Sequence, residues 1–301
     1  MAEFYNNNSF LINLVGINAI MALSIYITLS CAMLSLSNAA SMAIGAYTAA
    51  LLTQQAGWPL WLAVVAAAAV AGLVALLLGM PILRLRGVFL AIATLGFGEV
   101  IRIIIVNTPA LGGPEGFRLN AGNRSGVVTG LEIFGTLLVL AYFFARLKGS
   151  RMGLAMDAIR EDENAARTMG INVTFYKVMA YVTGAVVAGI GGALYAHLRS
   201  FLSPGDFGFQ RAVDILVFAV VGGTFAWRGA ILGAALITLL PEITRSVPVV
   251  AGLNIKDHPE IFSGLILLLV ILFLPKGLLT ISLGLKLRRP APRTLEKEAS
   301  P

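Results

Sequence analysis

Long apolar runs alternate with short polar stretches along the whole chain. A helix that crosses the hydrocarbon core of a bilayer needs about 20 mostly apolar residues. Nine runs reach this length or come close to it, at residues 10–33, 38–53, 58–80, 88–106, 127–145, 178–198, 212–224, 229–244 and 261–274. The pattern therefore predicts an all-α, polytopic helical membrane protein with about nine (eight to ten) transmembrane segments.

Three of these runs are short or interrupted by glycine, at 38–53, 212–224 and 261–274. We expect one of them to be a re-entrant segment or half-helix, since irregular backbone at membrane depth is tolerated where protein surrounds it. Small residues crowd several runs, as in 39–46 and 184–193. Because small residues let helices approach closely, tight packing in a bundle is the simplest explanation for them.

Composition excludes a water-soluble fold. Of the 301 residues, 58% are hydrophobic and 12% are charged, against roughly 25% charged in soluble domains. The single cysteine, Cys31, lies in the first apolar run, so neither an intrachain disulfide nor a cysteine metal cluster can form. A net charge of +7 would suggest a nucleic-acid partner in a soluble protein. Here it indicates basic cytoplasmic loops, and we expect no nucleic-acid partner.

The basic residues also predict the orientation. No lysine or arginine precedes Arg84, which leaves the N-terminus free to be translocated to the outside. An odd number of crossings then places the C-terminus in the cytoplasm. Residues 1–285 are expected to form the membrane domain, with one long polar loop at 149–177 on the inner side. The charged, proline-containing tail 286–301 is expected to be disordered on that side.

The loop 149–177 differs from the rest of the chain because it is polar and amphipathic. Met152, Met156 and Ile159 recur at helical spacing with charged residues between them, and Gly170 ends the pattern as a C-terminal glycine does. This predicts one short amphipathic helix or a pair of them. Such a helix could lie on lipid headgroups. Its polar face is mixed in charge rather than lysine-rich, however, which favours a protein partner.

Within this loop, the run 163–170 resembles the cytoplasmic coupling loop of ABC importer permeases, whose pattern is Glu-Ala-Ala, three residues, then Gly. The Ala-Ala-x-x-x-Gly part falls on Ala165, Ala166 and Gly170. The Glu of the family falls on Asn164, with an acid one position earlier at Glu163. The resemblance implies that the residues coupling this chain to an ATPase are Asp162, Glu163, Asn164, Ala165, Ala166 and Gly170.

Beyond the loop, residues 83–99, 112–116 and 273–278 resemble the branched-chain amino acid ABC transporter permease family, in particular its second, M-type permease subunit. The resemblance covers residues 16–277 approximately. It implies the permease subunit of a binding-protein-dependent importer that translocates leucine, isoleucine and valine across the bacterial inner membrane. ATP hydrolysis in separate ATPase subunits would drive it. A related permease for urea, amides or other amino acids would look much alike.

The implied partners are a homologous second permease, two cytoplasmic ABC ATPases, membrane lipid and an extracytoplasmic substrate-binding protein. The binding protein would meet the outer loops 107–126 and 248–259. A phosphate-binding loop needs Gly-Lys followed by Ser or Thr, and no lysine here precedes either residue. ATP and magnesium would therefore be used by the partner chains. This chain is expected to hold no cofactor and to be a transport subunit rather than an enzyme.

Ionisable residues inside membrane segments are costly and mark candidate functional sites. Glu99 and Arg102 are three positions apart, so on a helix they share a face and can neutralise one another. A structural ion pair is the favoured explanation, ahead of a substrate contact. Serine and threonine in membrane helices commonly bond neighbouring backbone. The candidates for the translocation pathway are Asn18, Ser41, Tyr47, Thr94, Glu99 and Arg102.

Two other classes of protein compete with a permease. For a membrane enzyme, His197 and His258 lack the spacing of a metal site and no Gly-x-Ser-x-Gly elbow occurs. We therefore expect neither catalytic nor metal-binding residues. An ion-coupled secondary transporter would also be a glycine-rich helical bundle. The loop 149–177 argues against it, because a secondary transporter does not need such a loop.

Overall fold

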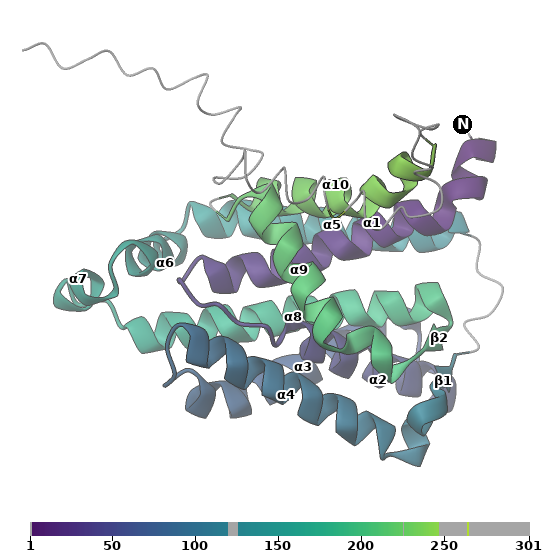
Figure 1. Ribbon diagram of the computed structural model, residues 1–301, viewed down its shortest axis with the longest axis horizontal. Coiled ribbons are helices and arrows are strands. Elements are labelled where there is room, and N and C mark those ends of the chain that lie inside the picture. Colours follow the sequence, from purple (N-terminus) through teal and green to yellow (C-terminus); the bar gives the residue numbers. More distant parts are fainter. Residues whose placement is uncertain (1, 120–125, 225, 247–263, 265–301) are drawn as a thin grey trace, which may run out of the picture.

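The computed structural model describes residues 2–119, 126–224, 226–246 and 264, and the described part is almost entirely helical (Figure 1). Its α-helices are α1 Ala2–Leu29, α2 Asn38–Gln55, α3 Leu60–Ile82, α4 Val88–Val106, α5 Gly126–Lys148, α6 Arg151–Glu161, α7 Glu163–Thr168, α8 Val173–Arg199, α9 Phe209–Gly222 and α10 Trp227–Ser246. The 3-10 helices are η1 Pro109–Leu111, η2 Gly113–Glu115 and η3 Pro204–Phe207. The short strands are β1 Phe117–Arg118 and β2 Phe201–Leu202.

The helices confirm the predicted class, an all-α polytopic membrane protein. Five of them, α1, α3, α4, α5 and α8, are long and apolar enough to cross a membrane, and the described residues hold up to six spans if α9 and α10 count as one. The second expected segment forms α2, which is fully helical but is not among these five. The ninth expected segment, the tail 286–301 and the loop 248–259 lie outside the described residues.

The seventh and eighth expected segments form two arms of one bent unit. The helices α9 and α10 turn by 119° at the break between them. With 14 residues, α9 is about 21 Å long at roughly 1.5 Å per residue, shorter than the hydrocarbon core of about 30 Å. Near the break, Arg160 of α6 donates from Nη1 to the carbonyl oxygen of Thr224 at 3.3 Å. The short run 212–224 is therefore one arm of a broken span or re-entrant loop.

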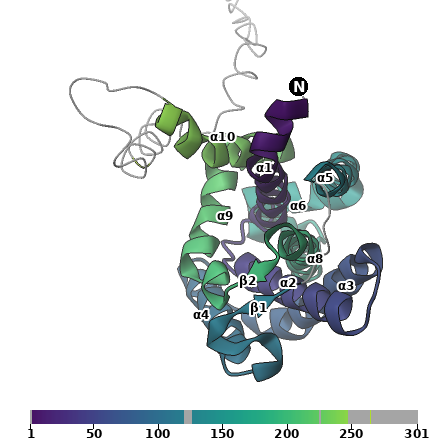
Figure 2. The ribbon, with the colours of Figure 1, turned by 90° about the vertical axis from the view of Figure 1, so that its right-hand side faces the viewer.

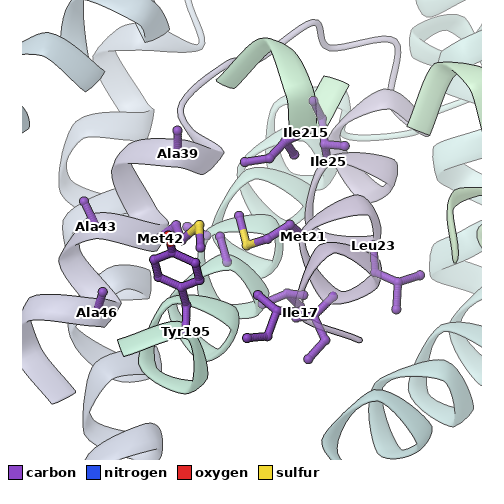
Figure 3. Packing of buried hydrophobic residues seen from close by; sticks show 14 of the residues in the cluster. Ile17, Met21, Leu23, Ile25, Ala39, Met42, Ala43, Ala46, Tyr195 and Ile215 are labelled. Carbon is purple, nitrogen blue, oxygen red and sulfur yellow. The ribbon is translucent and has the colours of Figure 1, made fainter. Parts of the chain in front are cut away.

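The bundle is built around α8, which packs against α1, α2 and α3 (Figure 2). Small residues make this packing possible. A side chain at Gly192 would collide with the backbone of Met42 on α2, and one at Gly184 would come within 2.7 Å of the Ser24 carbonyl oxygen on α1. Figure 3 shows the buried side chains of Met21, Met42 and Tyr195 meeting in the core formed there by α1, α2 and α8.

The molecule has two ends that carry different structures (Figure 1). At one end, which we call the α7 end, lie the α3–α4 connection (83–87), α6, α7 and the start of α8. At the other, the β end, the strands β1 and β2 pair antiparallel with Phe117 opposite Leu202. This pairing joins the segment after α4 to the segment after α8. The helices α4 and α8 run between the two ends, so their length separates the α7 end from the β end.

Candidate functional site

The polar loop predicted from the sequence forms two helices, α6 and α7, that project from the α7 end of the bundle (Figure 1). Ser150 caps α6, accepting a hydrogen bond at Oγ from the Gly153 amide at 3.3 Å. Asp162 separates the helices and caps α7, accepting at Oδ1 from the amides of Asn164 at 2.8 Å and Ala165 at 3.0 Å. These caps satisfy amides that a helix start leaves unpaired, so each helix begins at a defined residue.

The stop of α7 explains the spacing of the Ala-x-x-x-Gly pattern. The amide of Ile171 donates to the carbonyl oxygen of Ala166 at 3.0 Å, and the amide of Gly170 donates to that of Arg167 at 3.0 Å. This pair of bonds is the Schellman motif, which needs a left-handed residue just past the helix. Gly170 supplies it, with φ of 83°. The glycine is required by its backbone conformation, because a Cβ there would meet no atom within 4 Å.

Ala166 lies on the buried side of α7. It is 4% exposed and packs in a small cluster with Ile159 and Val173, against which Ile171 and Tyr176 also pack. This cluster is separate from the main core of the bundle. It joins α6, α7 and the first turn of α8, so Ala166 serves the attachment of α7 rather than its outer surface.

Glu163 fixes α7 to two other elements. Its Oε1 lies 2.6 Å from Arg167 and 3.5 Å from Arg86 in the α3–α4 connection, and its Oε2 lies 2.7 Å from Lys177 Nζ on α8. Burial alone would raise the pKa of Glu163. The hydrogen bond and charge of Lys177, with the charges of Arg86 and Arg167, outweigh burial and hold this pKa below its ordinary value. The carboxylate therefore stays ionised at neutral pH.

The outer surface of α7 carries the remaining motif residues. Asn164, at the position of the family's Glu, and Ala165 are both exposed. Met169, just after the helix, is 82% exposed. The structure thus divides the six predicted residues of the loop: Asp162 and Gly170 shape the helix, Glu163 and Ala166 attach it, and Asn164 and Ala165 face outward.

The six pathway candidates do not share one cavity. Thr94 accepts at Oγ1 from the Leu36 amide at 3.0 Å, which ties α4 to the segment after α1. Tyr47 packs edge-on against Phe207 with ring centroids 5.9 Å apart, and Ser41 is buried in α2. Thr94 and Tyr47 therefore make contacts between elements.

Glu99 and Arg102 form the expected ion pair, with Arg102 Nε 2.7 Å from Glu99 Oε2. Their side chains are 45% and 39% exposed, respectively. Glu99 also lines a cavity of about 280 Å³ whose other walls are largely apolar. The lining residues are Leu36, Ala39, Ile92, Leu95, Gly96, Gly98, Glu99, Phe207, Gly208, Phe209 and Ala212.

Asn18 belongs to a charged site at the β end that sequence reasoning missed. It donates from Nδ2 to Thr238 Oγ1 at 2.9 Å, and its Oδ1 accepts from Arg211 Nη2 at 2.8 Å. The guanidinium of Arg211 also lies 5.7 Å from the ring centre of Tyr195. Among the described residues, no carboxylate comes within 4.0 Å of this guanidinium.

Arg211 opens onto a cavity of about 300 Å³ that contains both signs of charge. Asp206 lies 3.8 Å from Arg199, and Asp214 accepts at Oδ1 from Gln210 at 3.1 Å. The lining residues are Phe10, Leu14, Tyr195, Arg199, Gly205, Asp206, Gln210, Arg211 and Asp214. The signal in the sequence was an arginine and an aspartate three positions apart at the start of an apolar run. Their partners on α1 and α8 are distant in sequence.

A bundle of apolar helices with one polar helix pair projecting from its end is the architecture of a multi-pass membrane protein. The family model that matches the chain is that of a transport permease, which is not an enzyme. The chain belongs to the family described as branched-chain amino acid transport system / permease component, which matches residues 7–274.

Individual relatives agree with this family. The chain is 32% identical to the "high-affinity branched-chain amino acid transport system permease protein LivM" of Salmonella typhimurium, over 88% of this chain and 66% of the relative. LivM of Escherichia coli strain K12 gives the same identity and coverage. LivH of Salmonella typhimurium is 27% identical over 56% of this chain and 51% of the relative. The chain thus spans about two thirds of the LivM length. No solved structure matches it.

Proposed function

We propose that this chain is the M-type permease subunit of an ABC importer for leucine, isoleucine and valine, driven by ATP hydrolysis in two separate ATPase subunits. The observation that carries the proposal is the α6–α7 pair, which projects from the bundle and is held to it at several points. The relatives named as branched-chain amino acid permeases support the substrate. An ion-coupled transporter has no use for such a projecting, braced helix.

The bracing of α7 lets a force applied to its outer surface reach the spans. Glu163 links α7 to the α3–α4 connection through Arg86 and to α8 through Lys177. The cluster of Ala166 with Val173 adds an apolar attachment to the same turn of α8. Since α8 packs against α1, α2 and α3, a displacement of α7 would be transmitted to the centre of the bundle. Packed elements transmit shifts because close-packed interiors are stiff.

The outer surface of α7 fits a protein groove better than a lipid surface. Met169 offers an exposed apolar side chain beside the polar Asn164 and Thr168. The helix contains an acid, Glu163, and a base, Arg167, rather than the lysine-rich face of helices that lie on headgroups. We assign this surface to the ATPase. The basic residues at the α7 end support a cytoplasmic location for this end, with the N-terminus outside and the C-terminus inside.

The cavity at the β end supports an amino acid as the substrate. A free amino acid carries a carboxylate and an ammonium group, and Arg211 and Asp214 line the same cavity with the matching charges. Phe10 and Leu14 give an apolar wall for an aliphatic side chain. Urea and simple amides are neutral and would leave both charges unpaired, which disfavours them. In the proposed orientation this cavity faces the extracytoplasmic binding protein that delivers the substrate.

The relatives also support a second permease as a partner. The chain is similar to proteins named LivM and, more weakly, to proteins named LivH. We propose that a homologous LivH-type subunit completes the membrane part of the importer. The cavity beside Glu99 is bounded by α2, α4 and the start of α9, and α4 carries the exposed apolar residues Val100 and Ile103. These residues suit either lipid or the second permease.

The test is ATP-driven leucine uptake into proteoliposomes that contain this chain with its co-expressed permease and ATPase subunits. Met169→Asp should remove ATPase association and uptake, because a charge replaces the apolar contact. Met169→Leu is the matched control and should retain both. If Met169→Asp assembles and transports like the wild type, α7 is not the ATPase contact. If the wild-type complex binds ATPases but takes up no branched-chain amino acid, the substrate assignment is wrong.

A further inference from the structure

A large cavity lies at the α7 end, between the α3–α4 connection, α7 and the first turns of α8. Its volume is about 680 Å³, within the range of about 300–1,000 Å³ that is typical of ligand pockets. The lining residues are Met80, Leu83, Arg84, Arg86, Glu163, Arg167, Asn172, Val173, Thr174, Phe175, Lys177 and Val178. The bracing of α7 uses Glu163 with Arg86 and Lys177. It explains neither the open space beside these residues nor the presence of Arg84 there.

The charge of the cavity is strongly positive. Arg84, Arg86, Arg167 and Lys177 line it, and Glu163 is the single acid among the lining residues. Glu163 pairs closely with Arg167 and Lys177, at 2.6 Å and 2.7 Å, and more loosely with Arg86, at 3.5 Å. The side chain of Arg86 is 64% exposed. Arg86 is therefore free to turn to an anion in the cavity at little cost, and Arg84 has no ion pair among the described residues.

The position of the cavity is fixed by the ends of three spans. The span α3 ends at Ile82, α4 begins at Val88, and α8 begins at Val173. These ends of the three helices lie at the α7 end (Figure 1). The end of a span marks the boundary between hydrocarbon and headgroups. The cavity therefore opens at the depth of the phosphate groups of one leaflet.

The remaining walls of the cavity are apolar. Met80 and Phe175 line it and are 63% and 52% exposed. Val88 and Phe89, at the start of the neighbouring α4, are 68% and 73% exposed. A ligand that fits must therefore combine an anionic head with an apolar body. A soluble anion would leave the apolar wall without a contact, and a protein segment would have to enter at the level of the lipid headgroups. Both features therefore favour a lipid.

We propose that this cavity binds the headgroup phosphate of an anionic phospholipid, with Arg84 and Arg86 as the phosphate ligands. Arginine holds a phosphate through two parallel hydrogen bonds, and basic pockets between membrane helices take anionic lipid headgroups. The acyl chains run past Met80 and Phe175 into the bilayer. Because Glu163 and Arg167 of α7 share the cavity, the bound lipid also fixes α7 to the membrane surface.

The test is native mass spectrometry of the delipidated full chain titrated with dioleoylphosphatidylglycerol or dioleoylphosphatidylcholine. The variant is Arg84→Gln with Arg86→Gln. The control is Arg146→Gln with Arg151→Gln, which removes the same charge at the same end but outside the cavity. Wild type and control should prefer the anionic lipid. In the variant this preference should fall roughly thirtyfold, since each of the two basic side chains contributes on the order of 1 kcal/mol near a membrane.

Two further experiments test whether the cavity binds a soluble phosphate or a protein partner instead of a lipid. Millimolar sn-glycerol 3-phosphate should not displace the anionic lipid from the wild type, and displacement would show that a free phosphate suffices. ATPase association in neutral lipid should be unaffected by Arg84→Gln alone, which leaves the pair of Arg86 with Glu163 in place, and its loss there would assign the cavity to a protein partner. Equal preference for the anionic lipid in variant, control and wild type would overturn the proposal. Thermal unfolding of each variant establishes that it is folded.

Discussion

Replacing Gly170 tests whether α7 depends on its left-handed stop. Gly170 has φ of 83°, and the left-handed conformation costs an ordinary L-residue roughly 1–2 kcal/mol. A Cβ at this position meets nothing within 4 Å, so no steric term adds to that cost. Gly170→Ala should therefore raise the population of opened α7 by a factor of about 5–30, while the spans stay intact.

The assay is amide hydrogen exchange of the whole chain, followed for peptides that cover α7. Asparagine tolerates the left-handed region better than alanine, so Gly170→Asn should lie between Gly170→Ala and the wild type. The matched control is Gly135→Ala on α5, where a Cβ also meets nothing within 4 Å but φ is not positive. The conformational argument is refuted if the amides of α7 in Gly170→Ala exchange as slowly as in the wild type. It is also refuted if this substitution accelerates the exchange of α5 more than that of α7.

Three further predictions concern other residues of the two ends. Ala166→Arg should unfold α7 and lose the ATPase, since it buries a charge in an apolar cluster. Ala165→Arg, on the exposed face, should also lose the ATPase but leave the amide hydrogen exchange of α7 unchanged. Equal exchange rates of α7 in the two variants would contradict the assignment of the buried and exposed faces. The lowered pKa of Glu163 means that its stabilisation of α7 is complete above its ordinary pKa of 4.5 and is lost as pH falls through the lowered value. Glu163→Gln should remove this pH dependence of exchange, and persistence of the dependence would exclude Glu163 as its source. Arg211→Lys should raise the KM for leucine by roughly tenfold, because a bidentate contact is lost, and Asp214→Asn should act similarly; unchanged KM in both would remove the cavity from the pathway.

The sequence predicted the spans well because each is encoded locally. The run 88–106 coincides with α4, and the run 58–80 differs from α3 by two residues at each end. The sequence predicted a half-helix or re-entrant segment at one of three short runs, including 212–224, but it predicted neither which run this would be nor its angle to α10, since the bend depends on contacts such as Arg160 with Thr224. Hydropathy reports how apolar a segment is, and it carries no information on the angle between two segments.

In the candidate sites too, features set by neighbouring residues were predicted, and features set by contacts distant in sequence were not. The helix pair around Gly170 followed from periodicity and a glycine stop, which are properties of neighbouring residues. The partners of Glu163 are Arg86 and Lys177, which lie on other elements, so its bracing role was not visible. Asn18 was named as a pathway candidate, but its bond to Arg211 joins residues separated by 193 positions. Single-sequence patterns do not report such contacts.

The central claim is that an ATPase drives this permease through the outer surface of α7. The direct measurement is photo-crosslinking from a benzophenone attached at Met169→Cys, followed by mass spectrometry of the captured chain; the single native cysteine, Cys31, is buried. We expect capture of an ATPase with a phosphate-binding loop, and we expect this capture to be lost when the label is moved to the buried Ala166 side of the helix. Recovery of the chain without an ATPase, together with leucine uptake driven by an ion gradient, would contradict it.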